Sequence, residues 1–133
     1  MKRTYILIPI FFISAISTMA FMMPSPDSYK HNECKLIAKD LVKAHSNANL
    51  VFILPLQDNG AYEMGEYSGH FLNAVTIQGK IYYIDYKTQT IMQNREEVLQ
   101  WYNLWYGKHA NSKAEIWDLK YERPPFPIIW HYP

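Results

Sequence analysis

Two apolar, β-prone runs stand on either side of Gln78-Gly79, a dipeptide suited to a tight turn. The first run covers residues 69–77 and the second covers residues 80–85. Together they predict an antiparallel hairpin, with a histidine at the start of one strand and an aspartate at the end of the other. The hairpin therefore carries His70 and Asp85 as candidate chemical groups.

The length of the loop decides whether these two side chains meet. With two residues in the loop, Ile77 pairs with Lys80, and His70 lies diagonal to Asp85 on one face of the hairpin. A four-residue loop keeps this register, whereas a three-residue loop puts the two side chains on opposite faces. Because diagonal neighbours are within reach of long side chains, an even loop predicts that Asp85 orients the His70 ring as a base.

Upstream of the hairpin, apolar positions between residues 34 and 45 recur at helical spacing if Cys34 and His45 are counted with them. The spacing predicts an amphipathic helix with Asn32 as its N-cap and Cys34 in its first turn. There the helix dipole favours a thiolate, and Asn32 and the Cys34 N–H are candidate oxyanion donors. The alternative is a cysteine that merely packs, since free cysteines are among the most buried residues.

The remaining apolar runs predict the rest of the sheet and a second helix. A buried strand is expected over residues 50–56, ending at its proline, and an edge strand over 114–121. Residues 94–105 begin with acidic residues and repeat apolar positions at helical spacing, so this helix is expected to pack on the sheet. The proline-rich tail at 122–133 is expected to pack on the same domain. The pattern predicts an α+β fold in which a helix bearing Cys34 packs on an antiparallel sheet.

The first twenty residues differ from the rest of the chain. A basic head is followed by an apolar run and by small residues ending at Ala20, the pattern of a signal peptide over residues 1–20. The alternative is an uncleaved membrane anchor over residues 5–23. In both cases a domain over 32–121, preceded by a linker at 21–31, is expected outside the cytoplasm, either periplasmic or secreted.

The composition narrows the class of partner. With 133 residues, 49% of them hydrophobic, the chain is long enough for one compact domain. Removing residues 1–20 leaves 11 basic against 12 acidic residues, so no charge excess favours nucleic acid or an anionic membrane as a partner. The single cysteine excludes an internal disulfide, so an exported thiol calls for burial or chemistry as its explanation.

The order of Cys34, His70 and Asp85 resembles the transglutaminase-like branch of the papain-type cysteine enzymes, including its bacterial cysteine proteinase-like members. In that family a cysteine begins a helix, a Gly-His pair begins a strand, and an aspartate ends the next strand of the same hairpin. Segments 32–35, 69–75 and 82–86 carry the resemblance. The residues that follow the cysteine and the aspartate, a lysine and a tyrosine, depart from what many relatives carry there.

The resemblance implies a small papain-like core and a cysteine hydrolase or acyltransferase that acts on peptide or related amide bonds without a cofactor. His70 would take the proton of Cys34, the thiolate would attack the carbonyl carbon, and Asp85 would stabilise the charged imidazole. The substrate would be a peptide or a protein, and a thioester would be the intermediate.

Three alternatives stay open. The same fold can serve as a catalytically inactive binding or inhibitory module. The chain can also be a membrane-anchored interaction protein that uses its aromatic tail as a contact surface. The third alternative is a metal site formed by His31, Cys34, His70 and Asp85, since the His-x-x-Cys spacing and these residue types suit zinc.

Overall fold

A computed structural model of the chain describes residues 23–63, 69–106 and 113–126. Within these ranges the chain forms a short 3-10 helix, two α-helices and five strands. In chain order they are η1 (Pro26–Ser28), α2 (Cys34–Ala44), β1 (Ala48–Leu56), β2 (His70–Ile77), β3 (Lys80–Asp85), β4 (Thr90–Met92), α3 (Arg95–Tyr106) and β5 (Lys113–Asp118).

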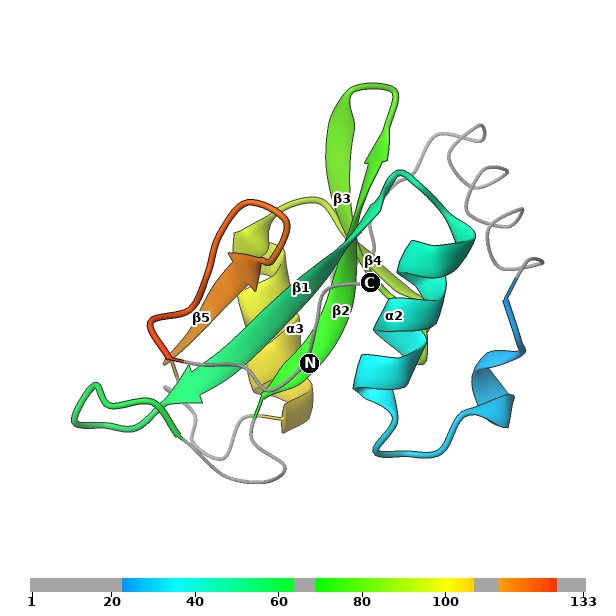
Figure 1. The fold of residues 1–133 in the computed structure, drawn as a ribbon. Coiled ribbons are helices and arrows are strands. Elements are labelled where there is room, and N and C mark those ends of the chain that lie inside the picture. Colours follow the sequence, from blue (N-terminus) through cyan, green and yellow to red (C-terminus); the bar gives the residue numbers. More distant parts are fainter. Residues whose placement is uncertain (1–22, 64–68, 107–112, 127–133) are drawn as a thin grey trace.

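All five strands belong to one antiparallel sheet, in the order β4-β3-β2-β1-β5. β2 is the central strand, so the residues at its start are flanked by other elements (Figure 1). The predicted α+β class is confirmed, and so is the edge position predicted for the last strand.

The β2–β3 hairpin has the predicted even loop. Gln78 and Gly79 both have positive φ angles, 52° and 78°, as a two-residue turn between twisted strands requires. Ile77 pairs with Lys80, and this register continues to Asn73 opposite Ile84. One further step along both strands sets Asp85 opposite the residue two positions after His70. The predicted register is therefore confirmed.

Helices α2 and α3 lie on opposite faces of the sheet (Figure 1), and a cluster of apolar side chains packs between each helix and the sheet. Alternation along β2 sends Val75 to the face covered by α2, and Leu72 and Ala74 to the face covered by α3. Ile37 and Leu41 are the buried residues of α2 in the first cluster. The core therefore consists of two layers on either side of a shared sheet.

Helix α3 begins as its sequence predicts. The Asn94 side chain accepts a hydrogen bond from the Glu97 N–H at 2.9 Å, and the Glu97 carboxylate accepts one from the Gln93 N–H at 2.8 Å. Of the residues expected to face the sheet, Val98, Trp101 and Tyr102 are buried, whereas Trp105 is 47% exposed. Gly107, the residue that the sequence predicts as the stop of this helix, lies outside the described residues.

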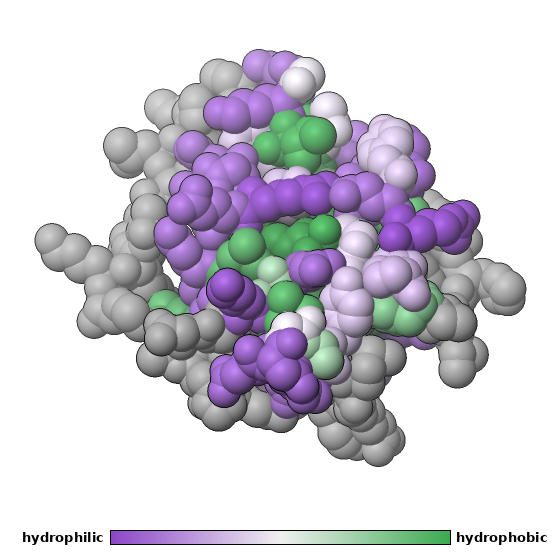
Figure 2. Space-filling view, turned by 90° about the vertical axis from the view of Figure 1, so that its left-hand side faces the viewer, coloured by the Kyte–Doolittle hydropathy of each residue, from purple (hydrophilic) through white to green (hydrophobic). Residues whose placement is uncertain are grey.

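A third apolar cluster lies over β1 and β5, where Tyr62 and Phe126 pack against Trp117. The Phe126 ring centroid lies 5.2 Å from that of Tyr62 and 5.8 Å from that of Trp117. On the side of the molecule that carries β5, apolar side chains gather in the middle and polar side chains surround them (Figure 2). The expectation that the tail packs on its own domain is confirmed for Phe126, and residues 127–133 lie outside the described ranges.

Two strands differ from their predicted bounds. β1 begins at Ala48 and continues through Pro55, because its pairing with β2 ends at Ile53 and the proline pairs with β5 and not with β2. β5 ends at Asp118 rather than at residue 121, because the Asp118 carbonyl accepts hydrogen bonds from the N–H groups of Tyr121 and Glu122 and turns the chain back.

The segment predicted as a linker contributes to the core. Met23 and Tyr29 are buried in the cluster under α2. The Tyr86 hydroxyl donates a hydrogen bond to the Pro24 carbonyl at 2.7 Å, and the Lys87 ammonium donates one to the Tyr29 carbonyl at 2.9 Å. Among the described residues, the packed core therefore includes Met23 and Tyr29, which precede the predicted start of the domain at residue 32.

The predicted signal peptide over residues 1–20 lies outside the described ranges, and so does the alternative anchor over residues 5–23 except for its last residue, Met23. Of the helices inside those ranges, none has the length and the apolar character needed to cross a membrane.

Candidate active site

His70 and Asp85 form a buried pair on the face of the sheet covered by α3. The His70 Nε2 atom and the Asp85 Oδ1 atom are 2.7 Å apart, and the two side chains are 7% and 4% exposed. The second carboxylate oxygen of Asp85 accepts hydrogen bonds from the Thr88 hydroxyl at 2.6 Å and from the Thr88 N–H at 3.1 Å. The turn after β3 therefore fixes the carboxylate that holds the imidazole.

The sequence reasoning did not assign a role to Thr88. A signal was nevertheless present, because an aspartate followed three positions later by threonine suits a local turn closed by side-chain hydrogen bonds.

Gly69 explains how His70 comes so close to β1. Its φ angle is 87°, in the region that favours glycine. A Cβ atom at this position would lie 2.8 Å from Phe52 Cζ and 2.9 Å from the Ile53 carbonyl oxygen. The Gly-His pair of the sequence is therefore a requirement of close packing at the start of β2.

Cys34 is the first residue of α2, but the predicted N-cap is wrong. The cap is Glu33, whose carbonyl accepts the first helical hydrogen bond from the Ile37 N–H at 3.0 Å. Asn32 lies exposed in the preceding turn, which the Lys30 N–H closes by donating to the Glu33 carboxylate at 2.6 Å. This turn delays the start of the helix by one residue. The oxyanion role of Asn32 stays a prediction.

The Cys34 thiol is hydrogen-bonded to the His70 side chain and to the Phe71 N–H. Because Asp85 occupies Nε2 of the imidazole, Nδ1 is the nitrogen that faces the thiol. The β2–β3 pairing ends at Asn73, short of His70 and Phe71, so the first turn of α2 can reach the start of β2. The three residues predicted as a group are therefore brought together.

The site favours a charged thiol and a charged imidazole. Burial raises the pKa of the Cys34 thiol, but the hydrogen bond with His70, its positive charge and the Phe71 N–H outweigh burial, so the pKa is lowered. Burial lowers the pKa of His70, but hydrogen bonds with Asp85 and Cys34 outweigh it and raise the pKa to about 9. These opposite directions are those of a thiolate–imidazolium pair.

Two aromatic residues of α3 lie beside the imidazole. The ring centroid of His70 is 5.6 Å from that of Trp101 and 6.5 Å from that of Tyr102. The imidazole is therefore packed against α3, and His70 is buried. The sequence predicted both residues only as core, because nothing local relates this helix to the start of β2.

Cys34 lies nearer to solvent than His70 and Asp85. Its side chain is half-buried, whereas theirs are 7% and 4% exposed. No side chain caps the start of α2, and the helix dipole places partial positive charge at this end of the helix. A carbonyl group that reaches the thiol from solvent therefore meets the amino end of a helix.

The metal alternative is contradicted. Throughout the described ranges, which include His31, Cys34, His70 and Asp85, no three histidine, cysteine, aspartate or glutamate side chains are grouped to hold a metal ion. The expected fourth ligand, His31, is exposed in the turn before α2.

Comparisons of the chain with protein-family models, curated proteins and solved structures find no match.

Proposed function

We propose that this protein is a cysteine hydrolase or acyltransferase that opens peptide or related amide bonds through a thioester on Cys34. The observation that carries the proposal is the continuous hydrogen-bonded line from the Cys34 thiol through the His70 ring to the Asp85 carboxylate. Three separate elements, α2, β2 and β3, supply these groups.

The geometry supports a two-step reaction. In the first step the Cys34 thiolate attacks the carbonyl carbon, and the oxygen takes up negative charge beside the amino end of α2. His70 then gives its Nδ1 proton to the leaving amine as the C–N bond breaks, which leaves a thioester on Cys34. Asp85 keeps its hydrogen bond to Nε2 throughout and stabilises the charged ring.

In the second step His70 acts as the base. The neutral imidazole takes a proton from water, the oxygen attacks the thioester carbonyl, and the thiolate leaves as the acid product forms. An amine in place of water gives acyl transfer with the same residues. The half-buried position of Cys34 supports both outcomes, since either acceptor can approach from solvent.

The resemblance to the transglutaminase-like branch agrees with this assignment of roles, and we keep it as part of the proposal. We also propose that the enzyme acts after export, because the first twenty residues have the pattern of a signal peptide.

The proposal is tested by alkylation, which the single cysteine makes unambiguous. The protein lacking residues 1–20 is treated with iodoacetamide over a range of pH, and the rate is compared with that of the same protein unfolded in urea. We expect the folded protein to react with an inflection well below the ordinary thiol value of about 8.5. Equal inflections in the folded and unfolded protein contradict the Cys34–His70 pair.

Acyl transfer is then tested with a p-nitrophenyl ester. Mass spectrometry should find an acyl group on Cys34 of the wild-type protein and none on that of His70→Gln, in which the thiol remains but the base is absent. Acylation of both proteins at the same rate would contradict the assignment of His70.

A further inference from the structure

The buried polar side chains of the described residues fall into two groups. His70 and Asp85 belong to the candidate site, and the others are Asn49, Asn73 and Asp118, which are 8%, 1% and 4% exposed. Burying an amide or a carboxylate costs free energy unless it is hydrogen-bonded. These three residues therefore need partners, and they find them in one network that reaches from α2 to α3.

Asn73 lies on β2 and bonds to α2. Its side-chain amide donates one hydrogen bond to the Ala38 carbonyl of α2 at 2.9 Å and another to the Asn49 carbonyl of β1 at 3.2 Å. Both amide protons are therefore used. Ala38 is 1% exposed and lies one helical turn after Cys34, so this contact is made directly below the nucleophile.

The first turn of α2 is thus attached to β2 at two points. At its start, the Cys34 thiol bonds to His70 and to the Phe71 N–H, and one turn later Ala38 bonds to Asn73. On β2, the attachment at Phe71 and the attachment at Asn73 lie only two residues apart. They fix both the distance of the helix from the strand and its position along it.

Apolar contacts alone do not fix that position so closely. Burial of apolar area is non-directional, so a helix that slides along a sheet can exchange one apolar contact for another. A hydrogen bond depends steeply on distance and angle. An apolar side chain at position 73 would also fill the core. What the amide adds is a directional contact that sets the position of α2 along β2.

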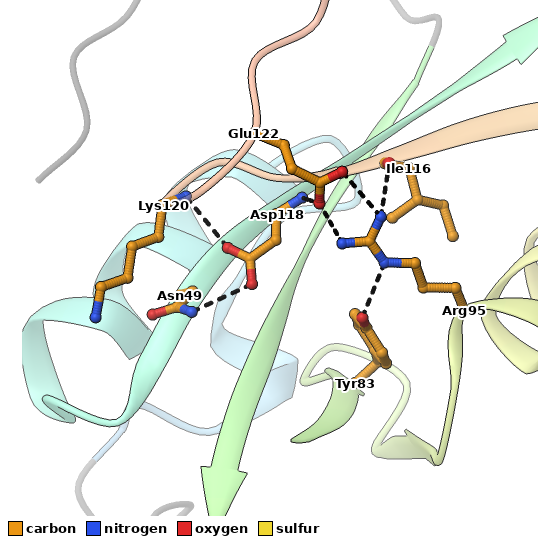
Figure 3. Close-up of polar contacts among 7 residues, drawn as sticks. All are labelled: Asn49, Tyr83, Arg95, Ile116, Asp118, Lys120 and Glu122. Carbon is orange, nitrogen blue, oxygen red and sulfur yellow. Dashed lines mark hydrogen bonds and ion pairs between the residues drawn. The ribbon is translucent and has the colours of Figure 1, made fainter. Parts of the chain in front are cut away.

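The network continues across the sheet toward α3. The Asn49 side chain donates a hydrogen bond to the Asp118 carboxylate at 3.2 Å, and the Asp118 N–H donates one to the Glu122 carboxylate at 3.1 Å (Figure 3). Glu122 in turn pairs with Arg95, the first residue of α3. The other partners of Arg95 are the Tyr83 hydroxyl and the Ile116 carbonyl.

The helix that begins at Arg95 carries the two aromatic rings beside His70. One network therefore ties the helix bearing the thiol to the helix that packs on the imidazole.

We propose that Asn73 is a positioning residue, whose amide holds the first turn of α2 along β2 so that the Cys34 thiol meets the His70 ring. This inference rests on the proposed function and deepens it. It separates the residues that react from the residue that aligns them.

The test compares two variants of the same strand face. Asn73→Leu keeps the branch of the side chain at Cγ and removes both hydrogen bonds. Val75→Ala lies two residues along β2, is also packed under α2, and removes apolar contact while leaving the amide in place. We expect Asn73→Leu to raise the inflection of iodoacetamide alkylation by about one pH unit, a tenfold lower rate below the inflection. Val75→Ala should lower Tm and leave the inflection unchanged.

A second readout does not depend on the charge of the thiol. The Phe71 N–H bonds to Cys34, so its hydrogen exchange reports the contact directly. We expect exchange to be about tenfold or more faster in Asn73→Leu than in Val75→Ala when the two are compared at equal stability. This measurement tests the alignment even if the wild-type thiol titrates normally, an outcome that would overturn the proposed function alone.

The inference is overturned if Asn73→Leu keeps the wild-type inflection and the wild-type Phe71 exchange, or if Val75→Ala shifts both equally. Asn73→Val, which is β-branched and smaller, carries the same test if leucine prevents folding. If neither variant folds, Asn73 acts on stability, and its role as a positioning residue is refuted.

Discussion

Two pairs of opposite charge connect distant parts of this molecule at different depths. The side chains of His70 and Asp85 are 7% and 4% exposed, whereas those of Arg95 and Glu122 are 40% and 39% exposed. The first pair lies under α3 and the second lies at the start of that helix. The His70–Asp85 pair therefore lies in a low dielectric, whereas the Arg95–Glu122 pair lies in contact with solvent.

The two environments change what a hydrogen bond does to each pair. Around Glu122, the Arg95 guanidinium lowers the pKa of the carboxyl, and burial opposes it only in part. Around His70, burial is the largest single influence and lowers the pKa, yet Asp85 and Cys34 together reverse it. The buried pair thus depends on its hydrogen-bond geometry, whereas the exposed pair can be replaced by water.

The largest expected effect comes from Asp85→Ala. Removing one partner of a buried pair costs about 3 kcal/mol of unfolding free energy, the low end of the usual range because His70 can lose its proton. The alkylation inflection of Cys34 should rise at the same time, since the imidazolium loses its counter-charge. Urea denaturation measures the first effect and iodoacetamide the second. A loss below about 1 kcal/mol would make the buried pair no stronger than an exposed one.

The His70–Asp85 pair should also give the stability of the protein a dependence on pH. The pKa of His70 is raised from 6.5 to about 9, so its stabilising contribution is complete below pH 6.5 and is lost as the pH rises through about 9. The thiol has a lowered pKa and acts in the opposite direction, so the measurement is made on a Cys34→Ala background. In that background Cys34 no longer raises the pKa of His70, so the pH at which the stabilisation is lost reports the contact with Asp85 against the opposing effect of burial.

On that background, the stability difference between the proteins with and without His70→Gln should shrink as the pH rises across this window. Urea denaturation at several pH values measures it. A constant difference would show that His70 is not held in its charged form.

The smallest expected effect comes from Glu122→Ala. An exposed pair contributes about 0–1 kcal/mol, and the loss should shrink further in high salt because the charges are screened. Tm measured with and without added salt checks this. A loss as large as that of Asp85→Ala, unaffected by salt, would mean that Glu122 acts through the buried Asp118 rather than through Arg95.

The sequence was sufficient for the hairpin and for the proximity of its two polar groups. The two-residue turn at Gln78-Gly79 and the alternation of side chains along a strand are local features. The register of the hairpin follows from them, and so does the placement of His70 and Asp85 on the same face. The position of Cys34 at the start of a helix is local as well. Its cap was misplaced because Asn32 and Glu33 differ only in how the preceding turn closes.

The surroundings of the site could not be read from the sequence. Whether Trp101 lies against His70 depends on which face of the sheet α3 covers, and that depends on the whole core. Asn73 carries no local signal either, because its partner Ala38 is 35 residues away along the chain. Packing between elements decides such contacts, and a single sequence does not reveal it.

The two-residue turn of the hairpin also limits how this gene can change in length. Inserting or deleting one codon between positions 77 and 80 would exchange the two faces of β3, so that Ile84 would point toward His70 and Asp85 toward the core under α2. A two-codon insertion would keep the pairing. We therefore expect natural variants that retain Cys34, His70 and Asp85 to differ at this turn in steps of two residues.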